Sequence, residues 1–207
     1  MSRIQGHHVL VVAYLAGVAG TLWDWREHYL GMSAQAPHAV IDLGGLLAIA
    51  ILAFSGWRSF SRTTYAVIYI VLVLVALVLF APFVLMMAAP HSALMSGYMR
   101  VGMTRGVLLL QGPVVVLSVY AAWHWLELAP PTPARLAAAV GVVVVAAASV
   151  WDLYWHQTHP LEMGAAMNMM TVPPHQLILA GFLIGLAGSA ALIFARSKPS
   201  RPATMRA

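Results

Sequence analysis

Six apolar runs, each at least 18 residues long, constrain the fold of this chain more than any other feature. They cover approximately residues 7–28, 37–54, 64–89, 106–128, 134–155 and 174–195. A helix of about 20 apolar residues crosses a hydrocarbon core of about 30 Å, so each run is long enough to span a membrane. Lipid offers no partner to an unpaired backbone amide, and such runs therefore form helices. The sequence predicts an all-α membrane domain over residues 1–195, a bundle of six transmembrane helices, followed by a tail over residues 196–207.

The composition agrees with a membrane protein. Of the 207 residues, 61% are hydrophobic and 8% are charged, whereas about a quarter of the residues in a soluble domain are charged. The chain has no cysteine, which excludes disulfides, thiolate metal sites and cysteine-linked haem. No basic helix accompanies the net charge of +5, so we expect the lipid bilayer as partner and no nucleic acid. Partner subunits or a homo-oligomer remain open.

The basic residues indicate an orientation. Six helices place both termini on one side of the membrane, and eight of the 11 Lys and Arg residues fall on that side. Three fall on the other side: Arg26, Arg100 and Arg105. By the positive-inside rule, the termini are expected to be cytoplasmic, in a membrane of the bacterial inner-membrane type. The basic tail is then expected to lie near anionic headgroups.

The pattern Trp-Asp-x-x-x-His occurs twice, and each copy is followed by a Pro-His pair. The two copies comprise Trp23, Asp24, His28, Pro37 and His38, and Trp151, Asp152, His156, Pro174 and His175. Aligning them matches the first two helices with the last two, with the third and fourth inserted between. The first and fifth helices run in the same direction. The sequence thus predicts a parallel internal repeat about an axis along the membrane normal.

Each copy gathers one carboxylate and two imidazoles near the extracytoplasmic face. Positions i and i+4 share one face of a helix, so the Asp and the first His of each copy project together. Proline favours the first turn of a helix, which places the second His at the start of the next helix. Two imidazoles and a carboxylate bind Fe(II), Cu(II) or Zn(II) and leave coordination positions open. The predicted ligands are Asp24, His28, His38, Asp152, His156 and His175, around one dinuclear centre or two separate ions.

The two copies are not equal. Asp42 lies one turn after His38, where the second copy has Leu179. We expect Asp42 to orient a ligand rather than to bind the metal itself. Additional or supporting ligands are predicted at His159, His91 and Glu162, and Trp23 and Trp151 are expected to border an apolar access path. One copy is catalytic and the other structural, or both bind metal; the sequence leaves both readings open.

Methionines favour copper over iron. Nine of the 12 Met residues fall in the segments on the extracytoplasmic side: Met86, Met87, Met95, Met99, Met103, Met163, Met167, Met169 and Met170. Thioethers are soft ligands that select Cu(I). Methionine is also an adaptable packing residue for irregular loops, which is the competing explanation.

The motif resembles the C subunit of the copper membrane monooxygenases, the particulate methane and ammonia monooxygenases. In that family, an Asp-x-x-x-His segment and a further His on the next helix form an intramembrane copper site. The resemblance covers about fifteen residues per copy and carries onto Asp24, His28 and His38, and separately onto Asp152, His156 and His175. The chain departs from the family in having two motifs, in the spacing between the histidines and in its shorter length. The resemblance implies a copper-dependent oxidation and partner subunits.

These observations favour a membrane-embedded, copper- or iron-dependent oxidase or monooxygenase that acts on a small apolar or lipid-soluble substrate. No Ser or Cys nucleophile is paired with a base, which favours redox or Lewis-acid chemistry over nucleophilic catalysis. A zinc hydrolase with Glu162 as its base is a weaker reading. The main alternative is a non-enzymatic protein that binds and delivers copper, and a weaker one is a haem b protein. The motifs can also be explained without a metal, as hydrogen bonds at helix ends within an aromatic belt.

Overall fold

A computed structural model describes residues 6–30, 35–55, 60–88, 105–158 and 172–197 of the chain. The described residues form six α-helices and no strand: α1 (Gly6–Tyr29), α2 (Gln35–Ala53), α3 (Arg62–Ala88), α5 (Arg105–Glu127), α6 (Pro133–Thr158) and α7 (Pro173–Ser197). The all-helical prediction is confirmed. Each helix begins and ends within three residues of the apolar run from which it was expected.

Proline and hydroxyl residues mark several helix starts. The Ser61 hydroxyl accepts a hydrogen bond from the Thr64 amide at 3.0 Å, and Thr132 accepts one from the Arg135 amide at 3.2 Å. Both are N-caps, which satisfy amides that the first turn of a helix leaves unpaired. Pro133 and Pro173 begin α6 and α7, where the missing proline amide costs nothing.

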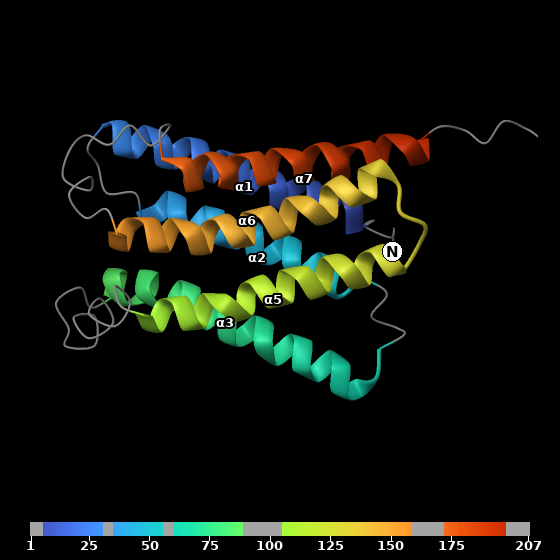
Figure 1. The fold of residues 1–207 in the computed structure, drawn as a ribbon, viewed down its shortest axis with the longest axis horizontal. Helices are drawn as coiled ribbons and strands as arrows, with labels where there is room; N and C mark the ends of the chain where they lie inside the picture. Colours follow the sequence, from blue (N-terminus) through green and yellow to red (C-terminus); the bar gives the residue numbers. More distant parts are fainter. Residues whose placement is uncertain (1–5, 31–34, 56–59, 89–104, 159–171, 198–207) are drawn as a thin grey trace, which may run out of the picture.

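Successive helices alternate in direction, so the start of α1 and the end of α7 lie at the same end of the bundle (Figure 1). We call this the terminal end. The opposite end, where α1 and α6 finish and α2 and α7 begin, carries both sequence motifs and is called the motif end. The predicted gathering of both motifs at one depth therefore follows from the helix directions.

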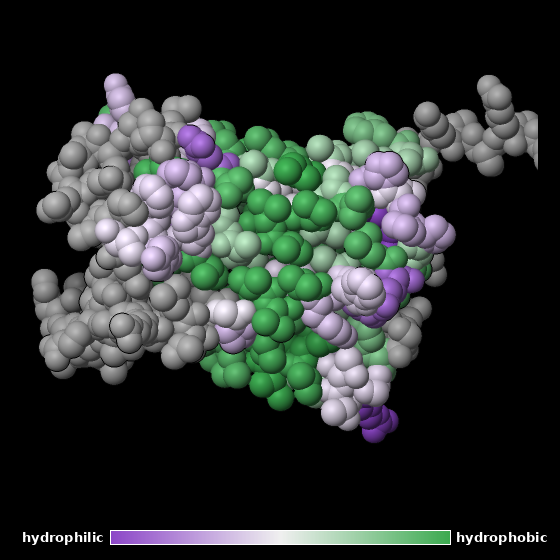
Figure 2. All heavy atoms as spheres, in the orientation of Figure 1, coloured by the Kyte–Doolittle hydropathy of each residue, from purple (hydrophilic) through white to green (hydrophobic). Residues whose placement is uncertain are grey.

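Four of the described helices are long and apolar enough to cross a membrane: α1, α2, α6 and α7. In α3, the apolar stretch found among the described residues is shorter and covers Arg62–Leu77. On the face that Figure 2 shows, hydrophobic residues form a band across the middle, with more hydrophilic residues towards both ends. Large apolar side chains are exposed on the helices, such as that of Val116 on α5 at 70%. These features are those of a membrane protein.

The backbones of α1 and α2 touch at Gly44. A Cβ atom added to Gly44 would lie 2.8 Å from the carbonyl oxygen of Ala13 and 2.8 Å from the amide nitrogen of Gly17. Real Cβ atoms do not approach a backbone so closely, so glycine is required for this separation of the helices. Small residues at such crossings are typical of membrane bundles, in which close packing replaces the hydrophobic effect.

The same contact occurs between α6 and α7 at Gly181. A Cβ atom there would lie 3.0 Å from the carbonyl oxygen of Gly141 and 2.9 Å from the amide nitrogen of Val145. When Trp23 is aligned with Trp151, Ala13 matches Gly141 and Gly17 matches Val145. The two helix pairs therefore cross at matching positions and through the same backbone atoms.

The two helix pairs are joined mainly where α1 packs on α7. Tyr14 and Phe182 are fully buried and meet edge to face, with ring centroids 6.4 Å apart. The Tyr14 hydroxyl donates to the carbonyl oxygen of Ala138 on α6, so its polar atom is satisfied within the apolar core. On the other side of the bundle, α5 packs against α2 and α6, and α3 lies outermost (Figure 1).

Gly44→Ala and Gly181→Ala are expected to destabilise the protein by about 1–3 kcal/mol each, because the added methyl group forces the paired backbones apart. The measurement is thermal unfolding in detergent. Gly112→Ala is the matched control, since a Cβ there meets nothing within 4 Å. An unfolding temperature for Gly44→Ala equal to that of the control would contradict the packing described above.

Candidate metal centre

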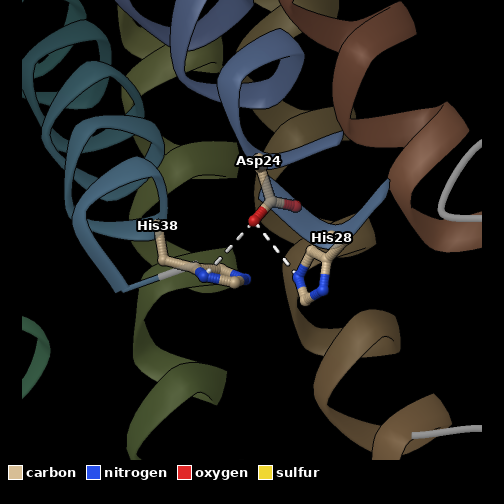
Figure 3. A group of neighbouring side chains, drawn as sticks. All are labelled: Asp24, His28 and His38. Atoms are coloured by element: carbon tan, nitrogen blue, oxygen red, sulfur yellow. Dashed lines mark ion pairs between the residues drawn. The ribbon is translucent and has the colours of Figure 1, made fainter. Parts of the chain in front are cut away.

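The first motif brings three ligand atoms together at the motif end. Asp24 and His28 lie one turn apart on α1, and His38 lies near the start of α2 (Figure 3). The Oδ1 atom of Asp24 is 3.4 Å from Nε2 of His28 and 3.5 Å from Nδ1 of His38. Asp24 is only 2% exposed. The side chains that the spacing predicted to project together therefore do so around a buried carboxylate.

Both contacts are ion-pair distances, and they would also accommodate a shared cation. An N–H···O bond has a donor–acceptor distance of about 2.7–3.2 Å, shorter than either contact. Two ligand atoms, each about 2.1 Å from an ion and at the tetrahedral angle, lie about 3.4 Å from one another. The three ligand atoms all lie within 4.8 Å of one another. Among the described residues, no other group of three Asp, Glu or His side chains meets this criterion.

The second motif is arranged differently. Nε2 of His175 lies 2.7 Å from Oδ1 of Asp152, within hydrogen-bonding distance. His175 is buried, with 3% of its surface exposed. His156 lies on α6 one turn after Asp152, and its side chain lies outside the described part of the structure. The second copy thus contains a tight Asp–His pair where the first has a looser group of three.

Both motifs face one cavity of about 240 Å³. Eight of its ten lining residues form four pairs that match when the two motif copies are aligned: Thr21 with Ser149, Asp24 with Asp152, His38 with His175, and Ile41 with Ile178. The other two are Asp42 and Leu153. The volume far exceeds the ~15 Å³ that one water needs, so an ion with open coordination positions has room there.

Thr21 and Ser149 were not singled out from the sequence, although each lies three residues before a motif Asp. The Thr21 hydroxyl donates to the carbonyl oxygen of Gly17 at 2.8 Å, and the Ser149 hydroxyl donates to that of Val145 at 2.9 Å. These acceptors also occupy matching positions. Comparing the hydroxyl residues of the two copies would have found them.

The cavity is lined by more acidic than basic side chains. Three aspartates line it, Asp24, Asp42 and Asp152, against two histidines, His38 and His175. None of the described lining residues is Lys or Arg. Ionisable groups within a membrane protein are costly unless they are paired, and they typically mark functional sites. A bound cation would balance these carboxylates.

Glu27 was also missed from the sequence. It is 7% exposed and accepts hydrogen bonds from the Trp23 indole at 3.0 Å and from the Arg26 guanidinium at 2.9 Å. Trp23 therefore fixes a neighbouring carboxylate. Neither Trp23 nor Trp151 is among the described residues that line the cavity, and both are more than a third exposed. Their role beside an access path stays a prediction.

Several predicted residues lie outside the described part of the structure: His91, His159, Glu162, the loop methionines from Met95 to Met103 and from Met163 to Met170, and the tail. The side chains of Met86 and Met87 are likewise outside it. Of the remaining histidines, His124 lies at the terminal end, where its Nε2 is 3.0 Å from the carbonyl oxygen of Ser55. His124 is therefore remote from both motifs.

Comparisons with known proteins give no relative: no family model, curated protein sequence or solved structure matches this chain.

Asp152→Asn and Asp24→Asn are expected to differ in their effect on the metal-free protein. Asp152→Asn weakens a close charge-assisted contact with His175 and should cost about 1.5–3 kcal/mol. Asp24→Asn removes a buried carboxylate whose contacts with His28 and His38 are longer, at 3.4 and 3.5 Å, so it should cost less stability than Asp152→Asn. Thermal unfolding after chelator treatment tests this, and a larger loss for Asp24→Asn would contradict it.

Proposed function

We propose that this chain is a membrane-embedded, metal-dependent oxidase or monooxygenase, with copper the favoured metal and iron or zinc the alternatives. Its substrate is a small apolar or lipid-soluble molecule. The ligands are Asp24, His28, His38, Asp152, His156 and His175. The single observation that carries this proposal is the cavity at the motif end, into which both motif copies project.

An internal repeat is part of the proposal. The matching glycine contacts at Gly44 and Gly181 support it, as do the matching hydroxyl bonds of Thr21 and Ser149. Two related halves that share one cavity favour a single centre with one or two ions over two independent sites. The group of Asp24, His28 and His38 is the primary site, since its ligand atoms are already close together.

Redox chemistry fits these side chains better than hydrolysis. The two hydroxyls that line the cavity both donate to helix carbonyls, and neither Thr21 nor Ser149 is placed beside a general base. Two imidazoles and one carboxylate leave coordination positions open, as in oxygen-activating iron and copper sites. The methionines and the resemblance to copper membrane monooxygenases favour copper.

The residues in and beside the cavity have separate tasks in this proposal. A metal bound there would supply the oxygen chemistry. Asp24 and His38, which line the cavity, and His28, which lies beside Asp24, would hold it. Asp42 would orient a ligand or carry a proton. Inserting one oxygen atom of O2 into a C–H bond, with the other leaving as water, consumes two electrons and two protons. The chain has no cysteine to form its own redox pair, so an external donor or partner subunit supplies the electrons.

The proposed topology has six spans with cytoplasmic termini in an inner membrane. The six described helices alternate in direction, and among the described residues Arg62, Arg135 and Arg196 lie at the terminal end, against Arg26 and Arg105 at the motif end. The metal centre would then lie near the extracytoplasmic surface, where metal ions are acquired.

Copper delivery is the second candidate function. The side chains of His28 and His38 are 28% and 39% exposed, which would let a partner reach the ion. Transport through the bundle is not favoured, because the described core beneath the cavity is apolar, with Leu10, Tyr14 and Phe182 fully buried. Oxygen consumption that depends on an organic substrate would decide for the oxidase, and metal transfer without oxygen consumption would decide for delivery.

His28→Ala and His38→Ala are each expected to lower the bound metal by about half or more, because each removes one of few ligands. The measurement is elemental analysis of untagged protein purified in mild detergent without chelator. His156→Ala tests the second motif in the same way. His124→Ala is the control, since His124 lies at the terminal end. Equal metal content in all four variants would eliminate the proposed ligand set.

The orientation can be tested with single cysteines, because the natural chain has none. Tyr29→Cys lies at the motif end and Leu128→Cys at the terminal end, where the native residues are 81% and 41% exposed. A membrane-impermeant maleimide should label Tyr29→Cys in intact spheroplasts, and Leu128→Cys only after lysis. The reverse pattern would place the motifs on the cytoplasmic side.

A further inference from the structure

A small apolar pocket adjoins the polar cavity. It has a volume of about 40 Å³ and lies among α2, α5 and α6. Ile41, Asp42 and Ser149 line both spaces, so the pocket and the cavity adjoin at these side chains. Its other lining residues are glycine, alanine, valine, leucine and isoleucine. The pocket therefore offers a non-polar space directly beside the candidate metal centre.

Among the described residues, the opening lies at one of two matching helix interfaces. Aligning the motif copies matches α2 with α7 and α6 with α1, so the interface of α2 with α6 corresponds to that of α7 with α1. Two pocket-lining residues, Gly45 on α2 and Val142 on α6, match Phe182 and Tyr14. Both aromatic side chains are fully buried and pack against each other. Between α1 and α7, two rings therefore fill the space that Gly45 and Val142 leave open.

A third difference lies where the pocket meets the cavity. Asp42 on α2 lines both spaces, whereas the matching residue on α7 is Leu179. The interface with the smaller side chains is therefore also the one with the additional carboxyl group. Three differences at one place distinguish an open interface, α2 with α6, from a packed one, α1 with α7.

The volume limits what the pocket can hold. A dry protein cavity of about 150 Å³ accepts benzene or a xenon atom. A pocket of about 40 Å³ has roughly a quarter of that space, which suits a guest of no more than about three heavy atoms. A water molecule would find mainly aliphatic walls and few hydrogen-bond partners, so an apolar guest is favoured.

We propose that the pocket between α2, α5 and α6 binds a small apolar molecule of at most about three heavy atoms and holds it beside Asp42 and the candidate metal centre. Dioxygen and a one- or two-carbon substrate share this chemistry. Binding of the guest does not require a metal. Its assignment as a reactant of the oxidation rests on the proposed function.

Xenon is the probe for the first test, applied to the chelator-treated full chain in detergent. Methyl NMR under xenon pressure should show saturable shifts for Ile49 and Val142, which line the pocket. Val12 reports xenon dissolved in the micelle, because its side chain is 59% exposed and lines neither the pocket nor the cavity. Shifts at Ile49 and Val142 that rise linearly with pressure, as at Val12, would overturn the proposal.

Gly45→Ala should abolish the saturable shifts, because its methyl group takes up pocket space. The added Cβ would lie 3.7 Å from Cγ1 of Val145, an ordinary contact, so the fold should tolerate the change. Gly112→Ala is the matched control on α5, where a Cβ meets nothing within 4 Å. Retention of saturable xenon binding in Gly45→Ala would show that the guest lies elsewhere and overturn the proposal.

A second test distinguishes the two candidate guests, dioxygen and the organic substrate. Gly45→Ala should raise the KM for dioxygen several-fold if the guest is dioxygen, or the KM for the organic substrate if the guest is that substrate. Gly112→Ala should change neither. Saturable xenon binding in a protein that binds no metal would preserve the pocket and reject the proposed function. Metal binding with turnover but without saturable xenon binding would preserve the proposed function and reject the pocket.

Discussion

The contact between helix backbones at Gly44 and Gly181 sets the distances on which the candidate metal centre depends. Each glycine lies six residues after the histidine that its helix contributes, His38 or His175. Each is also close enough to the partner helix that no Cβ could be accommodated. A larger side chain would move α2 away from α1, or α7 away from α6, and would withdraw the imidazole from its Asp. Small residues in the apolar core therefore determine the geometry of the polar end.

Charge is the second constraint. Three aspartates in one cavity of a membrane protein are unfavourable unless cations or protons balance them. The first copy separates its ligand atoms by 3.4–3.5 Å, while the second holds Asp152 against His175 at 2.7 Å. This contrast assigns different tasks to the two copies: one has the spacing of ligands around an ion, and the other supports its own histidine. Both tasks are compatible with one shared centre.

The differences between the two matching helix interfaces are as informative as their likeness. Between α1 and α7, Tyr14 and Phe182 fill the space with aromatic rings and tie α1 to α6 and α7. Between α2 and α6, Gly45 and Val142 leave the matching volume open, next to Asp42. Helix pairs with matching glycine contacts can thus differ in how they meet each other. In our proposal, the packing of the bundle and the binding of a guest then depend on different interfaces.

The sequence by itself determined the helices and the local ligand geometry, because both follow from short-range spacing. Runs of at least 18 apolar residues fixed six helices, and the i, i+4 spacing placed Asp24 beside His28. The sequence also indicated that both motifs share one end of the bundle. It did not reveal that they share one cavity, to which Thr21 and Ser149 also contribute. That arrangement depends on which helix faces meet. The meeting of the faces is decided by contacts between distant residues, such as Tyr14 with Ala138 and Gly17 with Phe182, which only the tertiary structure contains.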